Sequence, residues 1–239
     1  MKNNPFRLLT KFEILLWVFS LAAVTLAFLL VQSTDWLTLA ASLVGATALI
    51  FVSKGEVLGQ ILTVLFSLLY AVISWGFRYY GEMITYLGMT MPIAALSVVA
   101  WLRHPYEAGK TEVKIARLTK KQVLLMFALA AAVTAGFYFV LKAFDTANLA
   151  VSTVSVTTSF LASWLMLFRS PFYALAYAAN DAVLVTLWVL ASLENIAYLP
   201  VVVCFVIFFV NDAYGFFNWS RLLKRQIKKP EESALSSDS

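Results

Sequence analysis

Two aspartates lie deep inside apolar stretches of the chain, and each directly follows an asparagine, as Asn180-Asp181 and as Asn211-Asp212. A carboxyl group is expensive at membrane depth, so ionisable side chains kept there mark solute paths, proton relays or ligand sites. An asparagine amide both donates and accepts hydrogen bonds. The two pairs therefore predict a polar site for a bound solute within an apolar helix bundle.

Helical spacing gathers more polar groups around these pairs. At about 100° per residue, one face of the stretch from Phe172 to Leu193 groups Tyr173, Tyr177, Asn180, Asp181 and Trp188. The next stretch groups Asn211, Tyr214, Gly215 and Asn218. An earlier stretch groups Gln60, Thr63, Ser67 and Ser74, with Tyr70 at the margin. Three such helices are expected to enclose a cavity. The candidate substrate-binding residues are Gln60, Thr63, Tyr70, Tyr177, Asn180, Asp181, Trp188, Asn211, Asp212, Tyr214 and Asn218.

Interhelical packing is the competing interpretation of the smaller polar residues. Hydroxyl and amide side chains often join membrane helices without any ligand. The dense Ser and Thr between Ser152 and Ser163 fit either role. A carboxyl group is a costly way to join helices, so the two Asn-Asp pairs favour a ligand site.

Two residues of the fourth apolar stretch are candidates for gating. Glu82 lies at the outer end of the stretch, where a charge costs little, so it either gates the path or is solvated. Pro92 falls within the stretch, removes a backbone donor and crowds the preceding turn. It therefore predicts a kink suited to a hinge.

Composition excludes a water-soluble fold. Of 239 residues 62% are apolar and 13% charged, and the mean hydropathy is +0.83. The single cysteine, Cys204, can form no internal disulfide, and the single histidine, His104, stands at a helix end, so neither a metal nor a cofactor is expected. The net charge of +5 comes from basic residues at helix ends, which favour contact with anionic membrane lipid and not with nucleic acid.

Apolar runs of about 20 residues predict eight membrane-spanning helices, and hence an all-α, polytopic inner-membrane protein. The expected segments are Phe12 to Val31, Trp36 to Val52, Val57 to Phe77, Met83 to Leu102, Lys121 to Phe144, Leu149 to Phe168, Phe172 to Leu193 and Ile196 to Leu223. Of the 18 Lys and Arg, only Arg78 and Lys142 then fall on the side opposite the termini. The positive-inside rule therefore predicts that both termini are cytoplasmic.

A repeat is expected within these segments. The fourth ends in Trp101-Leu102-Arg103 and the eighth in Trp219-Ser220-Arg221, with turns at similar distances upstream. This favours two parallel three-helix units joined by a linker helix, a plan known in transporters, plus an extra amino-terminal helix. The expected divisions are 1–35 (extra helix), 36–103 (first unit), 104–147 (basic loop and linker helix), 148–223 (second unit) and 224–239 (polar tail, disordered from Pro230).

Other functional classes were weighed. Two membrane aspartates could form an intramembrane aspartyl protease, because they could share a proton and activate water. Asp212 lacks the Gly-x-Gly-Asp setting of such enzymes, and Asp181 follows Asn180 where they usually have tyrosine. No Walker loop and no mid-helix lysine is present, which excludes ATP-driven pumping and retinal binding. A structural membrane subunit stays open and is distinguished by a lack of saturable binding.

The residues resemble the PnuC vitamin transporters, whose members carry nicotinamide riboside and share a three-plus-one-plus-three helix plan with the SWEET sugar transporters. The resemblance covers the chain from the second apolar segment to Arg221. It depends on Arg169, on Asn180 followed by Trp188, and on the run Asn211-Asp212-Ala213-Tyr214-Gly215-Phe216-Phe217-Asn218-Trp219, which is its most specific element.

The resemblance implies facilitated, energy-independent uptake across the bacterial inner membrane, trapping by intracellular phosphorylation, and a homotrimer. It places the substrate site at Asn180 and Asn211 with aromatic neighbours such as Trp188 and Tyr214. Leu62 and Ala94 stand where related sequences can carry asparagine, so Gln60 is the candidate replacement.

The chemistry of the implied ligand agrees with these residues. Nicotinamide riboside has a cationic pyridinium ring, a carboxamide and a ribose. Tryptophan is the best aromatic partner for a cation, and asparagine matches both the carboxamide and the hydroxyls. Thiamine and riboflavin, which related members are thought to carry, remain alternatives. Proton coupling through Asp181 or Asp212 is a further variant of the same hypothesis.

Overall fold

The computed structural model describes residues 5–32, 35–76, 79–107 and 109–237. Within these ranges eight helical segments are long and apolar enough to cross a membrane. The described residues form no strand, only isolated bridges between Glu56 and Glu112 and between Pro105 and Val113. The prediction of an all-α protein with eight membrane-spanning segments is confirmed.

The helices begin and end within a few residues of the expected segments, apart from the carboxyl end of the last. They are α1 (Lys11–Leu30), α2 (Trp36–Ser53), α3 (Val57–Gly76), α4 (Tyr80–Thr85), α5 (Met91–Arg103), α6 (Lys120–Ala143), α7 (Leu149–Leu167), α8 (Tyr173–Glu194) and α9 (Leu199–Ser237). Short turns are η1 (Pro5–Leu8), η2 (Tyr86–Thr90) and η3 (Ile196–Tyr198). Phe77, the expected end of the third segment, and Arg78 lie outside the described residues.

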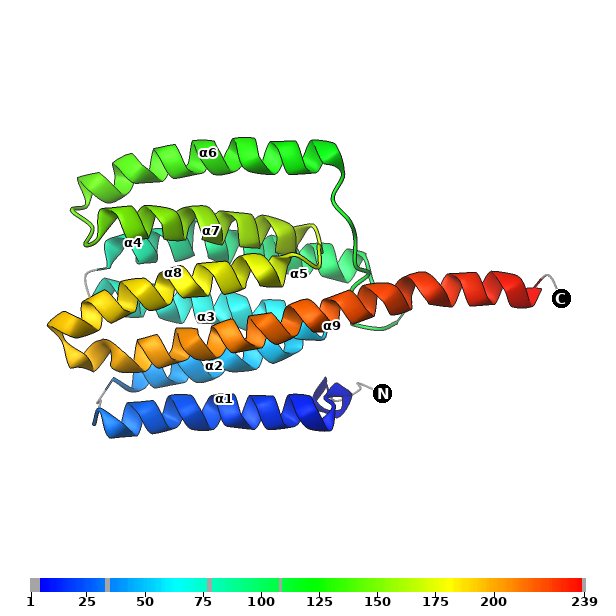
Figure 1. Cartoon of the computed structure of the whole chain (residues 1–239), viewed down its shortest axis with the longest axis horizontal. Helices are drawn as coiled ribbons and strands as arrows, with labels where there is room; N and C mark the ends of the chain where they lie inside the picture. The colour runs from blue at the N-terminus through cyan, green and yellow to red at the C-terminus, as the bar shows by residue number, and fades with distance from the viewer. Residues whose placement is uncertain (1–4, 33–34, 77–78, 108, 238–239) are drawn as a thin grey trace.

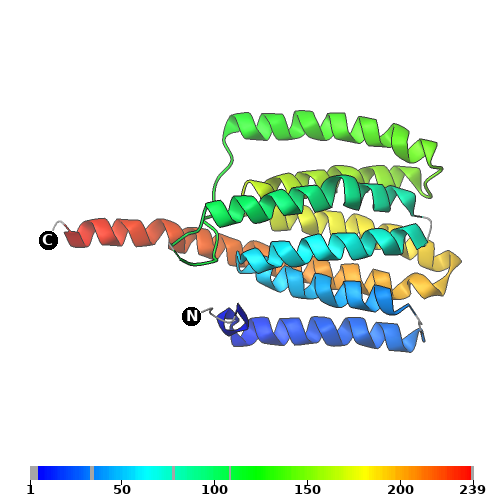
Figure 2. The ribbon, with the colours of Figure 1, turned by 180° about the vertical axis from the view of Figure 1, so that it is seen from behind.

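Six helices close a ring. Each of α2, α3, α5, α7, α8 and α9 contacts the next, and α9 returns to α2. Outside the ring, α1 packs against α2 and α9, while α6 packs on α7 (Figures 1 and 2). Only a small part of α6 is buried, because a helix on the rim of a membrane bundle can leave its apolar surface to lipid. The ring encloses the candidate site.

The fourth membrane segment is interrupted at the expected place. It runs as α4, then the π-helical turn η2, then α5, which has Pro92 in its first turn. In η2 the N–H of Met91 donates to the carbonyl of Tyr86, five residues back. Proline has no N–H for the ordinary ladder, so a wider turn just before Pro92 accommodates the lost donor.

Two tight turns end α2 and α7 in matching ways. Gly55 has φ of 71° and Arg169 has φ of 60°, and their N–H groups donate to the carbonyls of Val52 at 2.8 Å and Met166 at 2.9 Å. These two carbonyls also accept from tryptophans, Trp219 to Val52 at 2.9 Å and Trp101 to Met166 at 3.4 Å. Each tryptophan thereby ties its own helix to the first helix of the opposite half.

The loop between α5 and α6 runs along this same end of the bundle. The N–H of Val113 donates to the carbonyl of Gly55 and that of Ala116 to the carbonyl of Arg169, at 2.9 and 3.0 Å. Gln226 of α9 accepts from the N–H of Ile115 at 2.9 Å. The loop therefore connects the two turns to one another and to α9.

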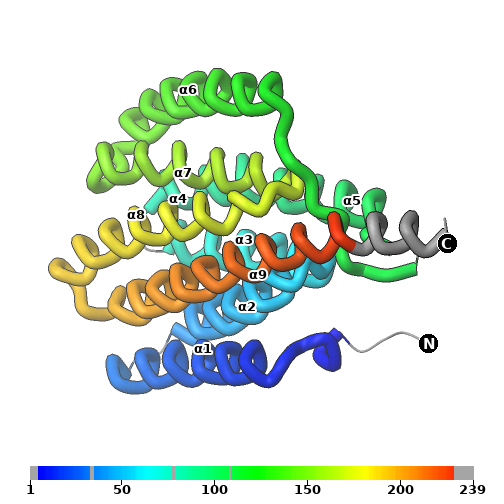
Figure 3. The backbone as a smooth tube through the Cα atoms, turned by 45° about the vertical axis from the view of Figure 1, so that its right-hand side comes forward, coloured from blue at the N-terminus to red at the C-terminus, as the bar shows by residue number. Residues whose placement is uncertain are grey.

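The carboxyl terminus differs from the prediction. A disordered polar tail is expected from Pro230, but α9 continues to Ser237 and projects beyond the bundle. Pro230 is followed by Glu231, Glu232, Ala234 and Leu235, and glutamate, alanine and leucine favour helix once the turn has formed. Both termini lie at the same end of the bundle, as an even number of crossings requires (Figure 3).

Candidate functional site

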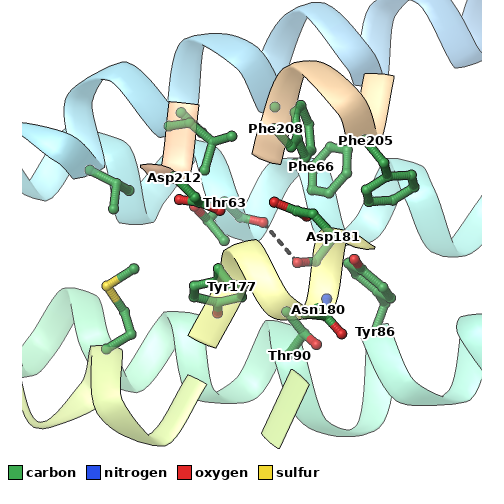
Figure 4. A pocket seen from close by; sticks show the side chains of 16 residues that line it. Thr63, Phe66, Tyr86, Thr90, Tyr177, Asn180, Asp181, Phe205, Phe208 and Asp212 are labelled. Carbon is green, nitrogen blue, oxygen red and sulfur yellow. Dashed lines mark hydrogen bonds between the residues drawn. The ribbon is translucent and has the colours of Figure 1, made fainter. Parts of the chain in front are cut away.

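The candidate site is a cavity of about 50 Å³ inside the ring of helices (Figure 4). It is lined by Gly45, Ala48, Leu49, Val52, Thr63, Phe66, Ser67, Tyr86, Thr90, Met166, Tyr177, Asn180, Asp181, Phe205, Phe208 and Asp212. Five of the predicted site residues therefore meet here: Thr63, Tyr177, Asn180, Asp181 and Asp212. They come from α3, α8 and α9, the three helices expected from the sequence.

The two aspartates face one another across the cavity. Asp181 of α8 and Asp212 of α9 are each 3% exposed, and both line the cavity. Oδ2 of Asp181 has no hydrogen-bond partner. Two buried carboxylates in one small cavity repel each other when both are ionised, so the pair favours at least one protonated carboxyl group. The pair is the most polar feature of the cavity.

The side-chain amide of Asn180 is held in place by hydrogen bonds from α7. Its carbonyl oxygen accepts hydrogen bonds from Thr158 at 2.7 Å and Ser159 at 2.9 Å, both on α7. With the oxygen occupied, the amide NH₂ is the group that remains for a ligand in the cavity. Thr158 and Ser159 of α7 thus join two helices and at the same time position a site residue, so helix packing and a role in the site both apply to them.

Aromatic rings form much of the remaining wall. Phe66 packs edge-on against Tyr86 and Phe208, with ring centroids 6.1 Å and 5.3 Å apart. Phe205 lies beside Phe208 at 5.5 Å, and Tyr177 shares a hydrogen bond of 3.1 Å with Ser163. Such rings attract a cation by about 0.5 to 2 kcal/mol each. The cavity thus combines aromatic faces with two carboxyl groups.

Most of these aromatic residues were not predicted from the sequence. Phe66, Tyr86, Phe205 and Phe208 lie in apolar runs that also contain exposed aromatic residues such as Trp75 and Phe209, and nothing in the spacing separates the two sets. The one available signal was the helical stripe of α3, where Phe66 neighbours Thr63 and Ser67.

The other predicted residues of α9 turn away from the cavity. Asn211 donates at 3.0 Å to Ser20 of α1. Tyr214 donates at 2.6 Å to Glu13, also of α1. Asn218 donates at 2.8 Å to the carbonyl of Ser53 at the end of α2. This face of α9 therefore joins helices, while the adjacent Asp212 faces the cavity.

Trp188 and Tyr70 lie together outside the cavity lining. Trp188 is fully buried and its indole donates at 2.8 Å to the hydroxyl of Tyr70. The ring centroids of Tyr79 and Trp188 lie 4.8 Å apart, and those of Tyr70 and Tyr86 lie 4.4 Å apart. Tyr86 lines the cavity, so this aromatic cluster closes the end away from the termini.

The remaining predicted residues lie elsewhere. Gln60 is 1% exposed and its amide nitrogen has no partner, but it does not line the cavity. Glu82, expected at a solvated helix end, is instead 1% exposed, because α7 covers it and Ser155 donates to it at 3.2 Å. Pro92 is exposed on α5, next to the π-helical turn. The sequence expectation of an inexpensive surface charge at Glu82 is therefore wrong.

No Lys, Arg or His lines the cavity within the described chain. Two loop residues, one towards each end of the bundle, have shifted pKa values. Burial lowers the pKa of Arg169 in the turn after α7, yet not enough to remove its charge. At the other end, burial raises the pKa of Tyr79 to about 12, so its hydroxyl stays neutral. A cation inside would be balanced by Asp181 and Asp212 alone.

The cavity is too small to hold a nucleoside-sized solute in this structure. Sites for drug-sized ligands hold roughly 300 to 1,000 Å³, several times the space here. A nucleoside-sized solute can enter only when the ring opens on one side. No cluster of three or more His, Cys, Asp or Glu suited to a metal ion occurs in the described ranges.

Comparison with known proteins gives a consistent picture. A family model described as Nicotinamide mononucleotide transporter matches residues 35–221. Two similar proteins are named nicotinamide riboside transporter PnuC. The one from Neisseria mucosa is 28% identical over 220 residues, covering 90% of this chain and 83% of the relative. The one from Haemophilus influenzae is 24% identical over 197 residues, covering 82% and 84%.

A solved structure has the same fold. The crystal structure of the vitamin B3 transporter PnuC superposes with a TM-score of 0.79 at 27% sequence identity, covering 91% of this chain and 94% of that one. The relatives are named as transporters and not as enzymes.

Proposed function

Because the chain belongs to the nicotinamide mononucleotide transporter family, we propose that it carries nicotinamide riboside across the membrane by facilitated diffusion. The observation that carries the proposal is the cavity that Asp181 and Asp212 line together with Asn180 and five aromatic rings. A pyridinium cation needs an anion and aromatic faces, and its carboxamide and ribose need hydrogen-bond partners. The names of the relatives support the choice of this solute.

The site assignment follows from the cavity. Asn180 donates to the carboxamide or ribose, and the carboxyl pair balances the ring charge, with Tyr177 and Thr63 as further lining. The six predicted residues outside the lining are assigned to an opened state of the site or to helix packing. They are Trp188, Tyr70, Gln60, Asn211, Tyr214 and Asn218. Glu82 and the turn before Pro92 are proposed as gating elements, because they border the aromatic cluster that closes one end.

Uptake of this kind is passive, and phosphorylation of the solute inside the cell would drive it toward NAD biosynthesis. The protein would sit in the bacterial inner membrane with both termini cytoplasmic, as the distribution of Lys and Arg indicates. The homotrimer that the resemblance implies belongs to the same proposal, and the mass of the detergent-solubilised complex tests it.

We propose the two-unit repeat because matching hydrogen bonds join the two units at the end of the bundle where the termini lie. Trp101 of the first three-helix unit bonds to the first helix of the second, and Trp219 reciprocates. The two units are residues 36–103 and 148–223, joined by the loop and linker helix 104–147.

Reconstitution into liposomes tests the function. Labelled nicotinamide riboside should equilibrate to equal concentrations on both sides without any gradient, and should accumulate when a nicotinamide riboside kinase and ATP are enclosed. Asn180→Ala should slow entry, whereas Gly136→Ala on the exposed face of α6 should not. Absence of entry by a folded protein would contradict the proposal.

Thiamine and riboflavin are the alternatives within the same class. Thiamine shares the cationic aromatic ring and would use the same carboxyl pair, whereas riboflavin is neutral. Parallel calorimetric titrations with the three vitamins discriminate among them. Saturable binding of thiamine alone would keep the carrier and change its solute.

A further inference from the structure

The carboxyl pair lies in surroundings that cannot balance a negative charge. The titratable groups that face it are Tyr86 of η2, Tyr173 and Tyr177 of α8, and Cys204 of α9. All four are neutral when protonated. Among the described residues, α2, α3 and α7 contribute no titratable side chain to the lining. Within the described ranges, the pair therefore has no cationic partner in the cavity lining.

An uncompensated charge in such a place is costly, by several kcal/mol even after relaxation. Protonation of both carboxyl groups avoids that cost and leaves the empty cavity neutral. Repulsion between two buried carboxylates in one small cavity also disfavours ionisation of both groups. A cationic solute changes the balance, because its charge can pair with one carboxylate while the other carboxyl group donates to that carboxylate.

From this geometry we propose that a monocationic solute enters the cavity in exchange for one proton of the Asp181–Asp212 pair. The O–H bond of one carboxyl group breaks, and the proton passes to the water on the side from which the solute enters. The cavity is neutral before and after binding. The inference rests on the proposed function, since nicotinamide riboside is the cation concerned.

The exchange has a consequence for transport. When the site opens on the other side, the solute leaves and one proton is taken up there. Each solute cation carried inward is then matched by one proton carried outward, so the membrane potential does no work on the cycle. Without a pH gradient the solute therefore still equilibrates to equal concentrations, and its removal inside, as by phosphorylation, keeps net uptake going.

Calorimetry of the full-length protein in detergent tests the exchange. Nicotinamide riboside is titrated at the same pH in phosphate and in Tris, whose ionisation enthalpies differ greatly, so that the difference in heat counts the protons released. About one proton per solute is expected, and Kd should fall as pH rises, by about tenfold for each pH unit wherever one proton is released. Reduced nicotinamide riboside, which is neutral and nearly the same shape, should bind with no proton release.

Variants separate the pair from other carboxyl groups. Asp181→Asn with Asp212→Asn should abolish the proton release and weaken binding of the cation at least tenfold, while binding of the reduced form persists and reports that the site is folded. Glu194→Gln is the control, because Glu194 is an exposed carboxyl group that does not line the cavity, and it should leave the count at one.

The outcomes are distinct. Binding of the cation without proton release in the wild-type protein would overturn the exchange and leave the proposed function intact. No binding of either form would overturn the proposed function, and the exchange with it. If the double variant does not fold, the comparison of the two ligands on the wild-type protein still decides.

Discussion

The indole nitrogen of Trp188 donates a hydrogen bond of 2.8 Å to the hydroxyl oxygen of Tyr70, and the two residues come from opposite halves of the chain. Trp188 is 0% and Tyr70 is 3% exposed. The bond joins α3 to α8 above the cavity, at the end away from the termini. Opening at this end would have to break it.

The first prediction concerns this bond. Tyr70→Phe and Trp188→Phe each remove one partner, so the double variant should cost less than the sum of the two. We expect a coupling of about 0.5 to 1.5 kcal/mol in the free energy of unfolding. Thermal unfolding of the four proteins in one detergent measures it. Additive effects would show that the bond is absent in the state that dominates in solution.

The second prediction distinguishes Asn180 from Asn211, which the sequence predicts equally as substrate-binding residues. Asn180 lines the cavity, whereas Asn211 donates to Ser20 of α1. Asn180→Ala should weaken binding of nicotinamide riboside by about 5- to 30-fold, the value of one or two good hydrogen bonds. Asn211→Ala should change Kd less than about threefold and lower the stability by about 0.6 to 1.7 kcal/mol.

Titration calorimetry and thermal unfolding of the two variants supply both numbers. A large loss of affinity in Asn211→Ala with α1 still in place would return that residue to the substrate site.

The third prediction concerns the contact of α2 with α3. A Cβ at Gly59 would lie 2.9 Å from the carbonyl carbon of Phe51 and closer still to the backbone nitrogen of Val52, and neither can move without α2. Gly59→Ala should cost about 2 kcal/mol or more. A Cβ at Gly136 would have no neighbour within 4 Å, so Gly136→Ala should leave the free energy of unfolding unchanged or raise it by up to about 1 kcal/mol. Equal melting temperatures for the two variants would contradict the close approach.

The fourth prediction is a pH dependence at Glu56, in the turn between α2 and α3. Burial raises the pKa of this carboxyl group, Glu112 adds to the rise, and the hydrogen bond from Thr111 opposes it. The folded state therefore holds the proton more tightly than the unfolded chain. The resulting stability is present below the ordinary pKa, about 4.3, and is lost as pH rises through the raised value.

Comparison with Glu56→Gln makes this measurable. Relative to the variant, the wild-type protein should lose melting temperature as pH rises from about 4 to 6.5. Glu194→Gln, at an exposed carboxyl group, is the matched control and should show no such trend. A constant difference between wild type and Glu56→Gln would contradict the shift.

The sequence by itself determined the number of membrane segments, their bounds to within a few residues except at the carboxyl end of the last, and the placement of both termini at one end of the bundle. Those properties depend on local composition, because about 20 apolar residues must satisfy their backbone in a helix wherever they occur in lipid. It also identified Asp181 and Asp212, since a carboxyl group in an apolar run is visible without any neighbour.

Only the tertiary structure decided which face of each helix meets which partner. Rotation of a helix about its axis is set by packing between helices, and one residue changes direction by about 100°. Hence Asp212 faces the cavity while Asn211 beside it contacts α1. For the same reason Glu82, at a helix end that looks solvated in the sequence, is buried by α7.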